Sequence, residues 1–199
     1  MPEIRLGFLA SHGGSNMQSI IDACKTGYAN AIPACVISNN STSMALQRAE
    51  KENIPYYHIS SAKYPTQEEL DDAIISTFKD NGVDIVVLAG YMKYLSPKVI
   101  RAFGSKVLNI HPALLPKFGG KGMYGFKVHE AVIASKEKIS GPTVHLVDEH
   151  YDHGKILGQK QVSVLPDDTK DTLAARVLEQ EHILYPEVIR RIADGEIKL

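Results

Sequence analysis

The sequence predicts an α/β fold with a doubly wound, mostly parallel sheet and an antiparallel extension at its carboxyl end. Two features carry this prediction. Four short apolar runs of strand type each lead into a helix-period segment within residues 1–105, and repeated βα units of this kind form parallel sheets. After residue 116 the alternation stops, and two strand-like runs flank an acidic loop. We expect these two strands to pair antiparallel.

The first strand, residues 4–10, leads through a glycine-rich turn into a helix. The turn lacks the GxGxxG pattern of dinucleotide-binding proteins, and the second strand, residues 33–38, is followed by no acidic residue that would hold a ribose diol. Because glycines allow close approach and a helix start presents free N–H groups, we interpret the turn as a site for a single phosphate. The alternative is an ordinary tight turn. The candidate phosphate-binding residues are Gly13, Gly14, Ser15 and Asn16.

The other βα units have equally local signals. Thr66 and Glu69 form a capping box before an apolar stripe of helical period. Ser96 and Pro97 start the next helix as its cap and first helical residue. The near-continuous apolar run at 83–89 is typical of a central parallel strand. In chain order we expect a helix at 41–52, a strand at 56–59, a helix at 66–81, the central strand and a helix at 96–104.

The fifth strand ends in Asn109 and His111. Side chains alternate faces along a strand, so these two point the same way. Pro112 keeps His111 extended and stops the strand. Ligands bind at the carboxyl ends of strands in open α/β sheets, and an amide with a protonated imidazole there supplies the donors that stabilise an oxyanion in acyl transfer. The alternative is a loop cap beside a hydrogen-bonded core histidine.

The segment after the fifth strand changes character. Residues 118–125 carry four glycines without a Walker pattern. We interpret them as a mobile lid or a loop that passes close to a ligand, with a flexible connector as the alternative. The remaining elements are, in order, a helix at 128–135, strands at 143–147 and 156–164, and a final helix at 169–193 that is kinked or displaced at Pro186.

The loop at 148–154 combines carboxylates with histidines, and His145 stands just before it. These are common metal ligands, but no HExxH helix occurs, and we expect no metal site. A surface cluster without a role is a further alternative. The interpretation that we favour pairs one loop carboxylate with His111, because a nearby negative charge raises the pKa of an imidazole. His111 would then donate to an oxyanion near neutral pH.

Length and composition narrow the class of protein. A chain of 199 residues suffices for one domain, and we expect a single domain, 1–199, with a phosphate-binding half (1–105) and a catalytic half (106–199). The 22 basic and 23 acidic residues leave a net charge of −1, which argues against nucleic acid and membranes as partners. Two cysteines without CxxC spacing, no signal peptide and no apolar span of roughly 20 residues predict a cytoplasmic protein.

Five separated motifs, in order along nearly the whole chain, resemble the folate-dependent formyltransferases. They are the turn at 11–16, the run at 87–95, Asn109-Ile-His-Pro-x-Leu-Leu-Pro116, the run at 143–154 and Gln180-Glu-His-x-x-Tyr-Pro186. The resemblance implies a Rossmann-like formyltransferase fold and favours the branch of the family that acts in de novo purine biosynthesis. The implied reaction transfers the formyl group of 10-formyltetrahydrofolate to the amine of N1-(5-phospho-D-ribosyl)glycinamide (glycinamide ribonucleotide). It implies no metal or prosthetic group, and a monomer or homodimer.

The resemblance also implies site residues by position. Asn109, His111 and Asp152 match the catalytic trio, and the turn at 13–16 matches the phosphate site. Glu181 matches the carboxylate that receives the substrate amine. We expect the second half to take part in folate binding as well, and the residues that match the family's folate-binding positions are Met92, Lys93, Tyr94, Leu95, Asp148 and Glu149.

Two departures from the family pattern stand out: His12 replaces a frequent glycine, and segment 60–67 has Lys63 where some members have an arginine. Two alternatives lie in the same class, namely another folate-linked formyltransferase and a formyltetrahydrofolate hydrolase. An alternative of a different class is a non-catalytic nucleotide-binding module, which needs the sheet and the phosphate turn alone.

Overall fold

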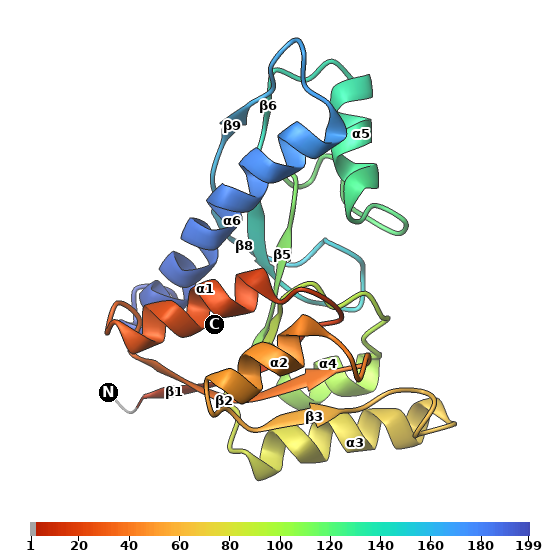
Figure 1. Cartoon of the computed structure of the whole chain (residues 1–199), viewed down its shortest axis with the longest axis vertical. Coiled ribbons are helices and arrows are strands. Elements are labelled where there is room, and N and C mark those ends of the chain that lie inside the picture. The colour runs from red at the N-terminus through yellow and green to blue at the C-terminus, as the bar shows by residue number, and fades with distance from the viewer. Residues whose placement is uncertain (1–2) are drawn as a thin grey trace.

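The computed structural model describes residues 3–199 as one sheet with helices on both faces and a smaller two-stranded sheet (Figure 1). The strands are β1 (Ile4–Leu9), β2 (Ala31–Ser38), β3 (Tyr56–His58), β4 (Ile85–Leu88), β5 (Val107–His111), β6 (Ile139–Ser140), β7 (Thr143–Leu146), β8 (Ile156–Gln159) and β9 (Val162–Ser163). The helices are α1 (Ser15–Lys25), α2 (Met44–Lys51), α3 (Gln67–Asp80), α4 (Pro97–Phe103), α5 (Phe126–Ala134) and α6 (Lys170–Ala193).

The main sheet has the strand order β3-β2-β1-β4-β5-β7-β8. The five strands from β3 to β5 are parallel, whereas β7 pairs antiparallel with β5 and β8 pairs antiparallel with β7. The predicted fold class is therefore confirmed, including its antiparallel extension. The order of the strands reverses between β1 and β4, and a crevice outside the carboxyl ends at such a point is where ligands bind in this architecture.

The alternation of side chains along each strand divides the core between two faces. In β4, Val87 packs with α1, α2 and α6, while Val86 and Leu88 pack with α3 and α4. A third cluster joins α5, β9 and the first half of α6 through Val132 and Leu173, among others. These elements lie together at one end of the molecule, beyond the main sheet (Figure 1).

One predicted strand at the carboxyl end differs from the structure, whereas the predicted final helix is present as α6. The run at 156–164 is not one strand, because its first part (β8) pairs with β7 and its last part (β9) pairs with β6. The final helix α6 continues through Pro186, which lies inside it and is buried with its neighbour Tyr185. Burial of this stretch against the sheet holds the helix together where proline removes one backbone hydrogen bond. Among residues 3–199, no helix combines the length and the apolar composition needed to cross a membrane.

Candidate active site

Strand β5 brings Asn109 and His111 to the carboxyl edge of the sheet, as the sequence predicts. Antiparallel pairing with β7 sets Asn109 opposite His145 and His111 opposite Thr143. The His111 side chain is buried, with 3% of its surface exposed. Its Nε2 lies 2.8 Å from the carbonyl oxygen of Phe118, so this nitrogen carries a proton and donates it to that carbonyl.

Asp152 reaches the same place from the loop between β7 and β8. Its backbone has a φ of +60°, a left-handed conformation that is uncommon for any residue other than glycine. The Oδ2 atom accepts from the N–H of Gly120 over 2.8 Å and lies 3.6 Å from Nδ1 of His111. The Oδ1 atom lies 3.6 Å from Nε2 of His145. The three residues that the resemblance groups together do lie together.

The pKa of His111 is lowered, whereas the sequence interpretation expected it to be raised. Burial lowers it, and the charge of Asp152 and the Phe118 carbonyl, which raise it, offset this only in part. The nearby His145 lowers it further. The sequence interpretation counted the charge of one loop carboxylate but omitted the cost of removing an imidazolium from water. The side chain of His111 is therefore mostly neutral near pH 7 before substrates bind.

Asp152 stays ionised despite its partial burial. Burial raises its pKa, but the neighbouring rings of His145 and His111 and the N–H of Gly120 lower it more, and the net pKa lies below the usual value. A carboxylate with such partners remains negative over the whole physiological range.

Asn109 is oriented by His145, a residue to which the sequence alone gave no role. Nδ1 of His145 lies 2.7 Å from the Leu146 carbonyl and therefore carries the proton of the neutral ring. Nε2 is then free to accept from the amide Nδ2 of Asn109 at 3.2 Å. The second amide hydrogen of Asn109 remains available to a ligand. The pairing of β5 with β7 is what reveals this contact.

The predicted phosphate turn joins β1 to α1. Gly14 precedes the helix with a φ of +66°, and a Cβ added there would meet Ala45 Cβ at 2.9 Å, so the position requires glycine. The helix start has no side-chain cap, which leaves its first N–H groups available. Gly13 is exposed and Ser15 half-buried, while Asn16 is buried and donates from Nδ2 to Oε2 of Glu181 over 2.5 Å. His12 is exposed beside the turn.

Glu181, on α6, is the second buried carboxylate of the site. It is 8% exposed, and Asn16 is its hydrogen-bond partner. Burial raises its pKa, and the Asn16 amide lowers it by a smaller amount. Glu181 is therefore able to hold a proton at a pH where an exposed glutamate is ionised.

The predicted folate-binding residues lie on two loops that face each other. Residues 91–95 follow β4. The ring centres of Tyr94, in this segment, and Tyr151, in the loop after β7, are 6.1 Å apart. Asp148 accepts from the N–H of His150, and Glu149 pairs with Arg101 at 2.6 Å. The two acidic side chains are thus already engaged in holding their own loop.

A single cavity of about 670 Å³ connects these groups. Asn16 and Glu181 line it together with Asn109, His111 and Asp152. Gly13, Gly14 and Ser15 do not contribute to its wall, so Asn16 is the member of the turn that reaches it. The cavity also has walls that the sequence did not indicate, above all the buried His129 on α5. All of the predicted folate-binding residues belong to the lining: Met92, Lys93, Tyr94, Leu95, Asp148 and Glu149.

The acidic loop does not gather metal ligands. Within residues 3–199, no group of three or more histidine, cysteine, aspartate or glutamate side chains is arranged to hold a metal ion. His150 and His153 lie beside each other on the loop, with ring centres 6.1 Å apart, whereas His145 points into the site toward Asp152.

A parallel sheet with this antiparallel edge, and a paired amide and imidazole at the end of β5, define a group-transfer site in a formyl transferase fold. The chain belongs to the formyl transferase family, because residues 4–189 match the model of that family. Its members are enzymes.

Two relatives and one solved structure point to one branch of the family. The chain is 45% identical to the chloroplastic phosphoribosylglycinamide formyltransferase of Vigna unguiculata, over 97% of this chain and 62% of that protein. It is 40% identical to the phosphoribosylglycinamide formyltransferase of Haemophilus influenzae, over 98% of this chain and 90% of that protein. The crystal structure of glycinamide ribonucleotide transformylase 1 from Symbiobacterium toebii superposes with a TM-score of 0.93 at 37% identity, covering 99% and 91% of the two chains.

Proposed function

We propose that this chain transfers the formyl group of 10-formyltetrahydrofolate to the amine of glycinamide ribonucleotide, a step of purine biosynthesis. One observation carries the proposal. A single cavity links Asn109, His111 and Asp152 to Asn16, the last residue of the predicted phosphate turn, and to Glu181. A folate-linked hydrolase needs only Asn109, His111 and Asp152. A transferase with a phosphorylated acceptor also needs groups that bind this acceptor, here Asn16 and Glu181. The relatives named above act on the same ribonucleotide by name.

The proposed reaction is a direct attack of the amine on the formyl carbon. A new C–N bond forms, the bond from the formyl carbon to the folate nitrogen breaks, and the proton lost by the amine finally reaches that nitrogen. The tetrahedral intermediate carries a negative oxygen. Asn109, through its free amide hydrogen, and His111 stabilise this oxygen, because donors held in place need no reorganisation as the charge develops.

His111 changes its protonation during this proposed reaction. It is mostly neutral when the site is empty, since burial lowers its pKa. The developing oxyanion adds a second negative charge beside the ring, with Asp152 on the other side, and together they favour the imidazolium. The proton of His111 is then stabilised when the reaction needs it.

Two further parts of the site follow from the same scheme. The buried carboxyl of Glu181, whose pKa is raised, would lie next to the amine of the substrate. We assign it the role of accepting a hydrogen bond from this amine. The Phe118 carbonyl occupies the Nε2–H of His111, so the formyl oxygen has to displace it. We infer that the glycine-rich segment after Phe118 moves when substrates bind, in line with its predicted role as a lid.

A coupled assay of purified protein tests the proposal. With glycinamide ribonucleotide and 10-formyltetrahydrofolate, we expect formylated ribonucleotide and tetrahydrofolate in equal amounts. Formate in place of the folate should give no product. Release of formate without the ribonucleotide would favour a hydrolase. Binding of the ribonucleotide without turnover would favour a non-catalytic nucleotide-binding module.

A further inference from the structure

Helix α2 holds the phosphate turn from outside the cavity. The backbone N–H of Ala45 donates to the His12 carbonyl over 3.0 Å. The Nε of Arg48 donates to the Gly13 carbonyl over 2.9 Å. Two successive carbonyls at the start of the turn therefore point toward α2, and Arg48 supplies one of the two donors.

These contacts fix the direction of the N–H groups. A trans peptide holds its C=O and N–H antiparallel, so the N–H groups of Gly13 and Gly14 point away from α2. Within residues 3–199, neither N–H donates a hydrogen bond to another protein group. Successive N–H groups that are free in a turn form an anion-binding concavity. The bond from Arg48 thus helps to present the groups that would bind a phosphate.

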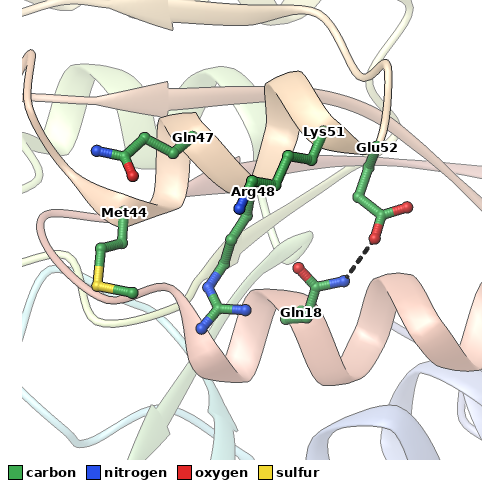
Figure 2. Close-up of a pocket in the computed structure, with 6 residues that line it drawn as sticks. All are labelled: Gln18, Met44, Gln47, Arg48, Lys51 and Glu52. Atoms are coloured by element: carbon green, nitrogen blue, oxygen red, sulfur yellow. Dashed lines mark hydrogen bonds between the residues drawn. The ribbon is translucent and has the colours of Figure 1, made fainter.

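The position of Arg48 also places a charge beside the turn. Its side chain reaches from α2 toward α1 across a hollow of about 350 Å³, which Lys51 and Gln18 also line (Figure 2). Burial lowers the pKa of His182 on α6, and the charge of Arg48 lowers it further. The guanidinium therefore acts on groups next to Glu181 as well as on the turn.

We propose that Arg48 is a positioning residue for the phosphate of the substrate. It keeps the Gly13 carbonyl, an acceptor that would repel an anion, turned toward α2, and it holds a positive charge on the α2 side of the turn. This inference rests on the proposed function, since it assigns the phosphate to the turn at 13–16.

Substitution of Arg48 tests the proposal with a matched control on the same helix. Arg48→Met removes the donor and the charge. We expect the KM for glycinamide ribonucleotide to rise about tenfold or more with kcat within about twofold, because uniform binding is lost. Arg48→Lys keeps the charge but not the fork of donors, and should give an intermediate KM. Lys51→Met removes the same charge from the same hollow and should leave the KM within about twofold.

A substrate without phosphate separates positioning from general damage. For glycinamide riboside, Arg48→Met should leave kcat/KM unchanged. An equal loss with riboside and ribonucleotide, or a KM effect in Lys51→Met as large as in Arg48→Met, would overturn the role of Arg48.

Inorganic phosphate gives a readout that does not depend on turnover. In the wild-type protein, its titration should shift the amide NMR signals of Gly13 and Gly14, and Arg48→Met should weaken this binding. Shifts with no formyl transfer would reject the proposed function but retain Arg48. No shifts in a wild-type protein that does transfer the formyl group would reject the role of Arg48 and keep the function.

Discussion

Asp152 and Glu181 are two carboxylates of one cavity, and their surroundings drive their pKa values in opposite directions. Asp152 faces His111, His145 and the N–H of Gly120, and its net pKa is lowered. Glu181 has Asn16 as its partner within the described residues, and burial raises its pKa. The first is therefore a permanent negative charge, and the second is a carboxyl that keeps its proton to a higher pH than an exposed glutamate does.

The difference shows how one cavity holds both an ionised carboxylate, Asp152, and a carboxyl that accepts a proton, Glu181. At the β5 edge, the charge of Asp152 raises the pKa of His111 but does not outweigh burial, and in the mechanism that we propose a second anion completes the shift to imidazolium. On the α6 side, desolvation by burial raises the pKa of Glu181, and no neighbouring charge within residues 3–199 is involved. Environment, and not residue type, separates the two roles.

The largest effect is expected from removal of His111, whose ring lies next to the Asp152 carboxylate. His111→Ala should lower kcat by about 10³-fold, because the proton or donor near the oxyanion is lost. The measurement is steady-state turnover with both substrates saturating, with the fold checked by circular dichroism. His58→Ala on the edge strand β3 is the control, and we expect activity within about twofold. A kcat within tenfold of wild type would reject the assigned role.

Asn109→Ala should have the next largest effect. Loss of one oxyanion donor costs about 10²–10³ in kcat in comparable sites. The KM values of the two substrates should change little, since this contact strengthens in the transition state. The exposed Asn30, substituted by alanine, serves as the control. A change confined to KM would show that Asn109 binds substrate and does not stabilise the oxyanion.

Asp152→Asn tests the fixed charge with nearly the same shape. Since the carboxylate raises the pKa of His111, we expect the variant to have a still lower imidazole pKa and a kcat reduced by about 10²-fold. An NMR titration of the His111 ring measures the first effect and an activity assay the second. The exposed Asp167→Asn should alter neither. An unchanged His111 titration would remove Asp152 from its role.

Glu181→Gln should give the smallest change in turnover and a change in stability of predictable sign. The folded pKa of Glu181 lies above its unfolded value, so the folded state binds more protons between these two pKa values and stability falls as the pH rises through them. A neutral glutamine avoids this loss. The variant should therefore gain in Tm relative to wild type as the pH rises from 4 to 8, as measured by thermal unfolding. A Tm difference independent of pH would show that the pKa of Glu181 is the same in the folded and unfolded states, contrary to the shift that burial causes.

Much of the site could be read from local sequence because it depends on neighbours in the chain. Gly14 and Asn16 follow a strand and open a helix, and Asn109 and His111 share a face by the alternation of one strand. The contact between Asn109 and His145 could not be read in this way, because it requires the register of β5 against β7. The lowered pKa of His111 was missed for a related reason, since burial depends on every segment that packs around the ring.

The sequence by itself determined the succession of βα units, the switch to antiparallel strands, the glycine-rich turn before α1 and the pair at the end of β5. Each of these features depends on the hydrophobic period, on the position of glycines or on a proline within a short stretch of sequence. Only the tertiary structure decided that Asp152 lies 3.6 Å from His111, that Glu181 bonds Asn16 across the cavity and that Arg48 holds the Gly13 carbonyl. Such contacts join segments far apart in the chain, and their geometry is set by the packing of the whole core.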